Sequence, residues 1–217
     1  MQNRRGLFAG MQSGRLSGFV PYKGTKDLPN AGRISRFIRN FVDMKVALCQ
    51  FSMEWEAAAR NLRRAEELVA QAGADLALLP EMFATGFVTE PWRTALPDEE
   101  ELLAWMRRTA RRYATALAGS AVVRSGDRFA NRFFFVRPAG GAERYDKRHL
   151  FSIGGEDAHF VAGRRRVVVE YGGLRFLPLV CYDLRFPVWC RCRSDYDAIL
   201  CVASWPAPRR EVWRTLL

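Results

Sequence analysis

Short apolar runs alternate with amphipathic stretches over most of the sequence, and this alternation restricts the possible folds more than any other feature. Residues 45–51 and 75–80 are apolar runs of strand length, whereas residues 55–73 carry apolar side chains at helical spacing. Gly73 stands where the helix should end, because glycine readily adopts the left-handed conformation of a C-terminal cap. The order strand–helix–strand is typical of a parallel crossover. The sequence therefore predicts an α/β protein.

The rest of the chain continues this alternation. Residues 97–118 form a second helical stretch, whose acidic start and basic later half complement the helix dipole. Further strands are expected at residues 117–124, 131–137, 141–145, 167–171, 174–181 and 197–204. Many strands with helices between them predict a layered α/β domain.

Residues 1–43 differ from the remainder, because glycine and proline interrupt every candidate periodicity. We expect an irregular basic extension that is poorly ordered, followed by a folded domain over residues 44–217. Residues 33–41 are compatible with a short basic amphipathic helix. The alternative, which we favour, is a leader translated upstream of a natural start at Met44.

The formal net charge of +11 raises the question of nucleic-acid binding. Residues 1–43 carry a net charge of +6, and residues 44–217 only +5. No basic helix, aromatic-studded strand or zinc-finger spacing accompanies this excess, so we expect no nucleic-acid partner. The sequence contains neither an apolar run of about 18 residues nor a secretory signal pattern. We therefore expect a cytoplasmic protein that does not bind membranes.

The chain has five cysteines, an odd number, and without a secretory signal they are better interpreted as reduced thiols than as a disulfide framework. Cys190 and Cys192 form a C-x-C pair, but His149 and His159 lie in another segment. A zinc site needs two closely spaced ligand pairs, so we expect no metal here.

Three strand ends carry reactive side chains, and the first is Glu81. It follows the apolar run 75–80, at the type of strand end where α/β sheets place active sites. Apolar neighbours on both sides should desolvate its carboxyl group, which raises a carboxyl pKa and suits a general base. The alternative is a solvated loop residue.

The second strand end is residues 145–151, in which Lys147 can place a permanent positive charge beside an oxyanion or a thiolate. An exposed charged turn is the alternative for its neighbours. His149 is a conceivable catalytic base, but we favour a structural hydrogen-bonding role for it.

The third strand end is the cysteine that closes an apolar run at residues 174–181. The thiolate is the reactive form of cysteine, and a neighbouring lysine would lower the thiol pKa. The backbone N–H of Tyr182 is placed to serve an oxyanion. Cys49 and Cys201 lie inside apolar runs and are expected to be small core residues. Cys181 is therefore the candidate nucleophile.

The segments LLPEMFATGF, YDKRHLF and LVCYDLRFP resemble the three signature blocks of the nitrilase superfamily of carbon–nitrogen hydrolases, and they occur in the same order. The resemblance runs from about residue 44 to 217. It implies an α–β–β–α sandwich of two sheets, a Glu81–Lys147–Cys181 triad and a second glutamate at Glu156. It also implies no metal or organic cofactor, and a homodimer formed through a face near the nucleophile.

Within that superfamily the likeness is to ω-amidases, which hydrolyse the side-chain amide of 2-oxoglutaramate and similar keto-acid amides. The resemblance implies attack of the cysteine on the amide, loss of ammonia and hydrolysis of a thioester. A distal substrate carboxylate requires a cation, which Arg185 or Arg209 would supply. Phe83 and Trp205 are expected to wall the pocket.

Relatives continue well beyond residues 213–217, so we expect a C-terminally truncated sandwich, with an incomplete second sheet and a homodimer only if the C-terminus were complete. Two other functions stay open. One is a different amidohydrolase of the superfamily, such as a carbamoylase or a nitrilase. The other is an inactive, truncated remnant.

Overall fold

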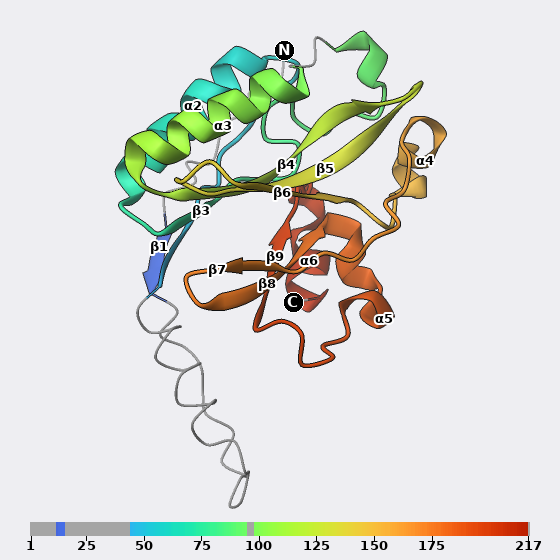
Figure 1. The fold of residues 1–217 in the computed structure, drawn as a ribbon. Helices are drawn as coiled ribbons and strands as arrows, with labels where there is room; N and C mark the ends of the chain where they lie inside the picture. Colours follow the sequence, from blue (N-terminus) through green and yellow to red (C-terminus); the bar gives the residue numbers. More distant parts are fainter. Residues whose placement is uncertain (1–11, 16–43, 95–97, 217) are drawn as a thin grey trace, which may run out of the picture.

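A computed structural model describes residues 12–15, 44–94 and 98–216 of the 217-residue chain, and their strands form two sheets (Figure 1). The first sheet has the order β1-β2-β3-β4-β5-β6, and the second has the order β7-β8-β9. The first contains β1 (Gln12–Arg15), β2 (Lys45–Leu48), β3 (Leu76–Leu78), β4 (Ala116–Ser125), β5 (Arg128–Val136) and β6 (Ala142–Asp146). The second contains β7 (Val169–Tyr171), β8 (Leu174–Val180) and β9 (Ala198–Val202).

The described residues also contain the α-helices α2 (Ala58–Ala72), α3 (Glu99–Tyr113), α4 (Glu156–His159), α5 (Pro187–Cys190) and α6 (Arg210–Leu216). Short 3-10 turns occur at Pro91–Arg93, Ser152–Gly154, Cys181–Arg185 and Ala207–Arg209. No helix in the described part of the chain is long and apolar enough to cross a membrane.

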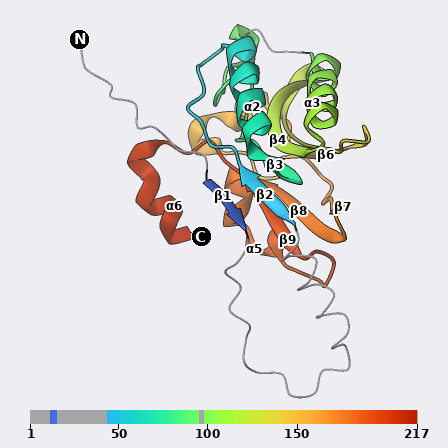
Figure 2. The same ribbon diagram turned by 90° about the vertical axis from the view of Figure 1, so that its left-hand side faces the viewer.

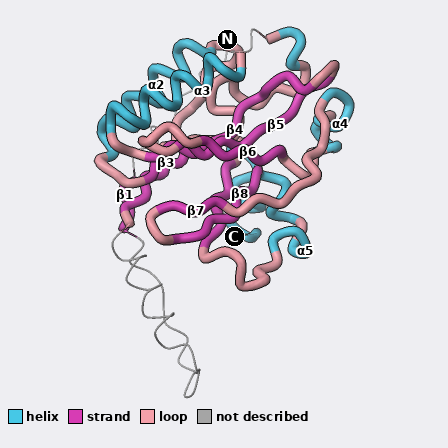
Figure 3. Tube along the Cα trace, viewed as in Figure 1, coloured by secondary structure: helices cyan, strands magenta, loops and turns pink. Residues whose placement is uncertain are grey.

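The order β2–α2–β3–α3–β4 forms two parallel crossovers, with Val46 opposite Leu76 and Leu76 opposite Ala116. Strands β4, β5 and β6 then follow as an antiparallel meander. Helices α2 and α3 lie side by side on one face of the large sheet (Figures 1 and 3). Figure 2 shows α6 standing apart from both. The strand–helix–strand prediction is therefore confirmed.

Helix α2 ends where the sequence predicted, because Gly73 caps it with φ 48°. Helix α3 starts where the Asp98 side chain accepts the Glu100 N–H at 2.8 Å. The expected helix over residues 97–118 is shorter, and α3 ends at Tyr113. The Thr115 hydroxyl donates to the Ala74 carbonyl at 2.8 Å, and the chain then enters β4 beside β3. Residues 116–118 also fit the helical spacing, but they pair with β3 and form the start of β4.

Apolar residues cover both faces of β5, as expected of a strand buried on two sides. Phe134 and Val136 belong to the core that packs against α2 and α3. Phe133 and Phe135 belong to a second core with residues of β8 and β9, such as Phe176. The two sheets therefore pack face to face, which confirms the α/β class and the nitrilase-like layering.

Part of the N-terminal segment lies within the described residues. Gln12–Arg15 form β1, which pairs antiparallel with β2 at the edge of the large sheet. The other residues of 1–43, including the possible helix at 33–41, lie outside the described residues.

Candidate active site

Three chain segments place candidate side chains at the ends of strands: the loop after β3 carries Glu81, the residue after β6 is Lys147, and the residue after β8 is Cys181. The backbone of Lys147 is fixed on both sides. Its N–H donates to the Asn131 carbonyl of β5 at 2.9 Å, and its carbonyl accepts from the Gly163 N–H at 2.9 Å. A Cβ atom at Gly163 would collide with the backbone of the residue before Lys147, so only glycine allows this approach.

The Lys147 ammonium lies between two carboxylates. Its Nζ is 3.0 Å from Oε1 of Glu81 and 2.8 Å from Oε2 of Glu156. All three side chains are at most 1% exposed. Burial acts to lower the pKa of Lys147, but the two carboxylates outweigh it, so the pKa is raised and the ammonium stays charged. The structure thus brings the first glutamate, the lysine and the proposed second glutamate together.

Three further groups bind these carboxylates, and sequence reasoning missed all of them. The Asn131 side-chain amide donates to Glu81 at 2.9 Å and to Glu156 at 3.1 Å. The Ser204 N–H donates to Oε2 of Glu81 at 2.9 Å, and the Phe151 N–H donates to Oε2 of Glu156 at 2.7 Å. The available signal for Asn131 was its place inside an apolar strand, where a polar side chain needs a partner.

Cys181 has a strained backbone and a shielded thiol. Its φ is 48°, a left-handed conformation that is uncommon for residues other than glycine and is concentrated at functional sites. Burial raises the pKa of the Cys181 thiol, and the charge of Glu81 and a hydrogen bond to it raise the pKa further. Lys147 acts in the opposite direction, as expected, but is outweighed. The expected contribution of the lysine is therefore present, but the net pKa of the thiol is raised, and the thiol lies beside Glu81.

A second polar network lies behind the nucleophile, around the fully buried carboxylate of Asp183. This carboxylate accepts the Tyr145 hydroxyl at 2.8 Å and the Val180 N–H at 3.1 Å. It also accepts the His149 backbone N–H at 2.8 Å, and the His149 ring lies 2.8 Å from it. His149 therefore has the structural hydrogen bonds that we favoured. The network ties the chain after β6 to the chain after β8.

Aromatic and basic side chains lie close to these loops. The Arg209 guanidinium lies 5.2 Å from the Trp205 ring and 6.0 Å from the Phe151 ring. The Phe151 ring contacts the Tyr182 ring at 5.2 Å. Arg185 is exposed and forms no ion pair within the described residues. Of the two arginines, Arg209 has the better defined position.

Phe83 does not have the expected position. Its side chain is fully buried, and it belongs to the core between the large sheet and the helices. The ring centroids of Phe83 and Trp105 of α3 are 5.9 Å apart. The expectation that Phe83 walls a substrate pocket is corrected on this geometry, because its ring packs against Trp105 of α3 in that core.

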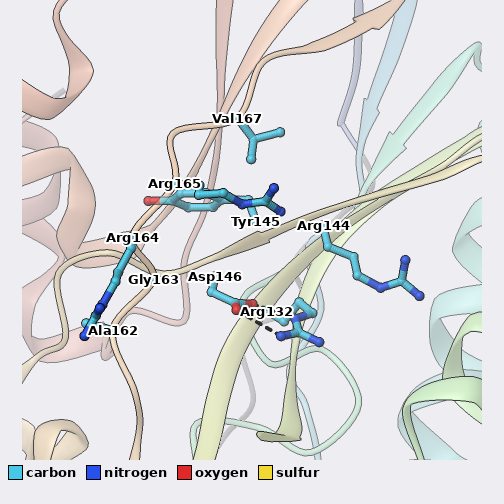
Figure 4. A pocket seen from close by; sticks show the side chains of 9 residues that line it. All are labelled: Arg132, Arg144, Tyr145, Asp146, Ala162, Gly163, Arg164, Arg165 and Val167. Carbon is cyan, nitrogen blue, oxygen red and sulfur yellow. Dashed lines mark hydrogen bonds and ion pairs between the residues drawn. The ribbon is translucent and has the colours of Figure 1, made fainter.

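Two cavities lie near the site. One of about 400 Å³ is lined by the ends of β2, β3 and β9 and by α6, and its walls include Pro80, Cys201, Trp205 and Trp213. The other, of about 360 Å³, lies beside β6 and is lined by arginines and Tyr145 (Figure 4). Within the described ranges, no group of three or more His, Cys, Asp or Glu residues is arranged to hold a metal ion.

Comparison with known proteins identifies a family that matches most of this chain. The sequence profile described as carbon–nitrogen hydrolase matches residues 45–216. Omega-amidase YafV of Yersinia enterocolitica is 46% identical over 175 residues, which cover 80% of this chain and 68% of that protein. The 2-oxoglutaramate amidase of Bacillus subtilis is 29% identical over 179 residues, covering 79% of this chain and 69% of that protein.

A solved structure has a similar fold. XC1258 from Xanthomonas campestris, described as a CN-hydrolase superfamily protein with an arsenic adduct in the active site, matches with a TM-score of 0.74. It is 38% identical, and the match covers 80% of this chain and 69% of that one.

Proposed function

Since the chain belongs to the carbon–nitrogen hydrolase family, we propose that it hydrolyses the terminal amide of a short keto-acid or dicarboxylic monoamide. The products are the acid and ammonia, and the intermediate is a thioester on Cys181. The observation that carries this proposal is the buried Glu81–Lys147–Glu156 cluster, with the Cys181 thiol beside Glu81. The amidase relatives support amide hydrolysis as the reaction type.

Because burial raises the pKa of the Cys181 thiol, the reaction requires a base at the moment of attack. Glu81 takes the thiol proton while the Cys181 sulfur bonds to the amide carbonyl carbon. The Lys147 ammonium and the Tyr182 N–H stabilise the oxyanion that forms on the carbonyl oxygen. Glu81 then gives the proton to the leaving nitrogen, and ammonia departs.

The thioester is hydrolysed by the reverse use of the same groups. Glu81 removes a proton from water, which attacks the thioester carbonyl, and the proton returns to the sulfur as the acid leaves. Glu156 supports this cycle from the other side of Lys147. It holds the ammonium in place at 2.8 Å and keeps it charged when Glu81 becomes neutral.

Substrate choice is assigned to the basic and aromatic side chains near the site. A keto-acid amide such as 2-oxoglutaramate carries a carboxylate at the end opposite its amide. We assign this carboxylate to Arg209, because the Trp205 and Phe151 rings hold its guanidinium close to the loop that bears Glu156. Arg185 is the second candidate for this contact.

The test is ammonia release from 2-oxoglutaramate, glutamine and a short nitrile, measured in parallel. The proposal expects the highest kcat/KM for 2-oxoglutaramate. Preference for the nitrile would favour a nitrilase, and release from a carbamoyl compound added as a fourth substrate would favour a carbamoylase. A folded protein that turns over none of them would support the inactive alternative.

The thioester has its own test. A Glu81→Gln variant retains the shape of the side chain but lacks the base for both steps. Acylation of Cys181 should be slow and hydrolysis of the thioester slower still, so the thioester should accumulate. Mass spectrometry of this variant with 2-oxoglutaramate should show Cys181 carrying the acyl group. A substrate-treated variant without added mass at Cys181, yet with continuing turnover, would contradict covalent catalysis.

A further inference from the structure

Asn131 lies among the groups of the candidate site but has no role in the proposed reaction. It lies in β5, is fully buried, and faces the same side of the strand as Phe133, toward the second sheet. Its backbone carbonyl accepts the Lys147 N–H at 2.9 Å. Its side chain reaches both carboxylates that hold the same lysine. One residue thus fixes Lys147 through the backbone and both partners of Lys147 through its amide.

The orientation of the Asn131 amide is set by these carboxylates. The NH₂ group donates to Oε1 of Glu81 and to Oε1 of Glu156, whereas the amide oxygen has no hydrogen-bond partner among the described residues. A flipped amide would point its oxygen at two anions. A buried acceptor without a partner costs about 1–3 kcal/mol. The two hydrogen bonds from the NH₂ group to the carboxylates therefore contribute more to stability than the unpaired amide oxygen costs.

The charges explain why this orientation matters. Two buried carboxylates share one ammonium, so the cluster has one more negative than positive charge. Two ionised carboxylates that share a site repel each other, so each depends on the cation and the donors around it. The backbone donors serve one carboxylate each, Ser204 for Glu81 and Phe151 for Glu156. Among the described residues, Asn131 is the neutral donor that serves both.

We propose that Asn131 is a positioning residue that keeps Glu81 and Glu156 ionised together around Lys147, and thereby sets the lowest pH at which Glu81 can accept the thiol proton. This inference rests on the proposed role of Glu81 as the base. Aspartate at this position would add a third carboxylate, and leucine would fill the space without donating. Neither can replace an amide that donates twice.

The experiment compares Asn131→Leu with Asn61→Leu. Asn61 is also buried, but its side chain bonds only to backbone groups of Glu54 and Ala84, on the helix-covered side of the large sheet. Both variants lose a buried amide of the same size. Only Asn131→Leu removes hydrogen-bond donors from Glu81 and Glu156. Comparing the two variants therefore distinguishes an effect on the carboxylates from a general loss of stability.

Two readouts are measured against pH: kcat/KM for 2-oxoglutaramate, and the rate of Cys181 alkylation by iodoacetamide followed by peptide mass spectrometry. A carboxylate that loses a donor holds its proton to higher pH. The acid limb of both profiles should therefore move up by about one pH unit or more in Asn131→Leu, since hydrogen bonds to charged groups are worth about that much. Asn61→Leu should lower the melting temperature and leave both limbs in place.

Different outcomes test the role of Asn131 and the proposed substrate separately. An unshifted acid limb in folded Asn131→Leu, or an equal shift in Asn61→Leu, overturns the role of Asn131. If Asn131→Leu does not fold, Asn131→Ser takes its place, because a serine hydroxyl is too short to bridge both glutamates, and the same shift is expected. If the parent protein hydrolyses no amide, the proposed substrate fails, whereas the alkylation profile still tests Asn131.

Discussion

The floor and the rim of the candidate site are held in very different ways. We define the floor as Glu81, Asn131, Lys147 and Glu156, and the rim as Phe151, Arg185, Trp205 and Arg209. Every floor side chain is at most 1% exposed. In the rim, both arginines are exposed, and Arg209 is held by contacts between its guanidinium and aromatic rings.

This difference in burial means that substitutions in the floor and in the rim have different free-energy costs. Removing one member of a buried ion pair leaves an unpaired charge, which typically costs about 3–5 kcal/mol. An exposed cation–π contact contributes about 0.5–1 kcal/mol. The floor therefore cannot change without losing both chemistry and stability, whereas the rim can change at little cost. We infer that the floor determines the reaction and the rim determines the substrate.

The largest expected effect comes from the residue that the floor activates. Cys181→Ala removes the atom that forms the thioester, so ammonia release should fall to background while the protein stays folded. Cys192→Ala is the matched control, because Cys192 is an exposed cysteine whose thiol donates to the Tyr196 carbonyl at 3.5 Å. Ammonia release at the parental rate by Cys181→Ala would show that the reaction does not pass through this sulfur.

The next largest effect should come from the centre of the floor. Lys147→Met preserves the length of the side chain but leaves two carboxylates facing each other without a cation. We expect turnover to fall by at least about a hundredfold, because the oxyanion loses its charged partner. The melting temperature should also fall, as measured by circular dichroism. A variant with unchanged stability and turnover would place the lysine outside the floor.

Part of the site could be predicted from the sequence, because Glu81 and Cys181 each close an apolar run and Lys147 follows a predicted strand. Such a junction is local, and it carries its own signal. Asn131 and the Ser204 N–H have no local signal of this kind. Their role depends on distances set by the pairing of β5 with β6 and of β8 with β9, and these pairings bring together residues far apart in the chain.

The rim and the helix boundaries were less predictable. The side chain of Phe83 is apolar and close to Glu81 in sequence, which favours a pocket wall as much as a core. Its direction is decided by contact with α3, a tertiary effect. In the same way, the end of α3 is decided by pairing of the following residues with β3, where helical spacing alone continued to residue 118.

The rim itself is tested by Arg209→Met. Kinetics with 2-oxoglutaramate should show kcat/KM reduced by about tenfold, mostly through KM, because a hydrogen bond between charged groups is lost. An amide without a distal carboxylate should lose much less. Arg214→Met is the control, since Arg214 lies on α6 and pairs with Glu211 on the surface. Equal losses for both substrates would mean that Arg209 supports the fold and does not read the carboxylate.

The smallest effect is expected from a buried group that does not belong to the floor. Tyr145 is 2% exposed, and its hydroxyl donates to Asp183 at 2.8 Å and accepts from Trp189 at 3.1 Å. Burial raises the pKa of this hydroxyl above its usual range, and the charge of Asp183 raises it further, so it stays neutral. Tyr145→Phe removes hydrogen bonds and no charge from the oxyanion, and the loop after β6 keeps the bonds of His149 to Asp183. We therefore expect kcat to fall only a few-fold and stability to fall by about 1–3 kcal/mol in denaturant unfolding. A hundredfold loss of kcat from this variant would contradict this expectation. It would show that burial of a side chain, and not its contact with the reacting charges, decides how strongly the side chain affects turnover.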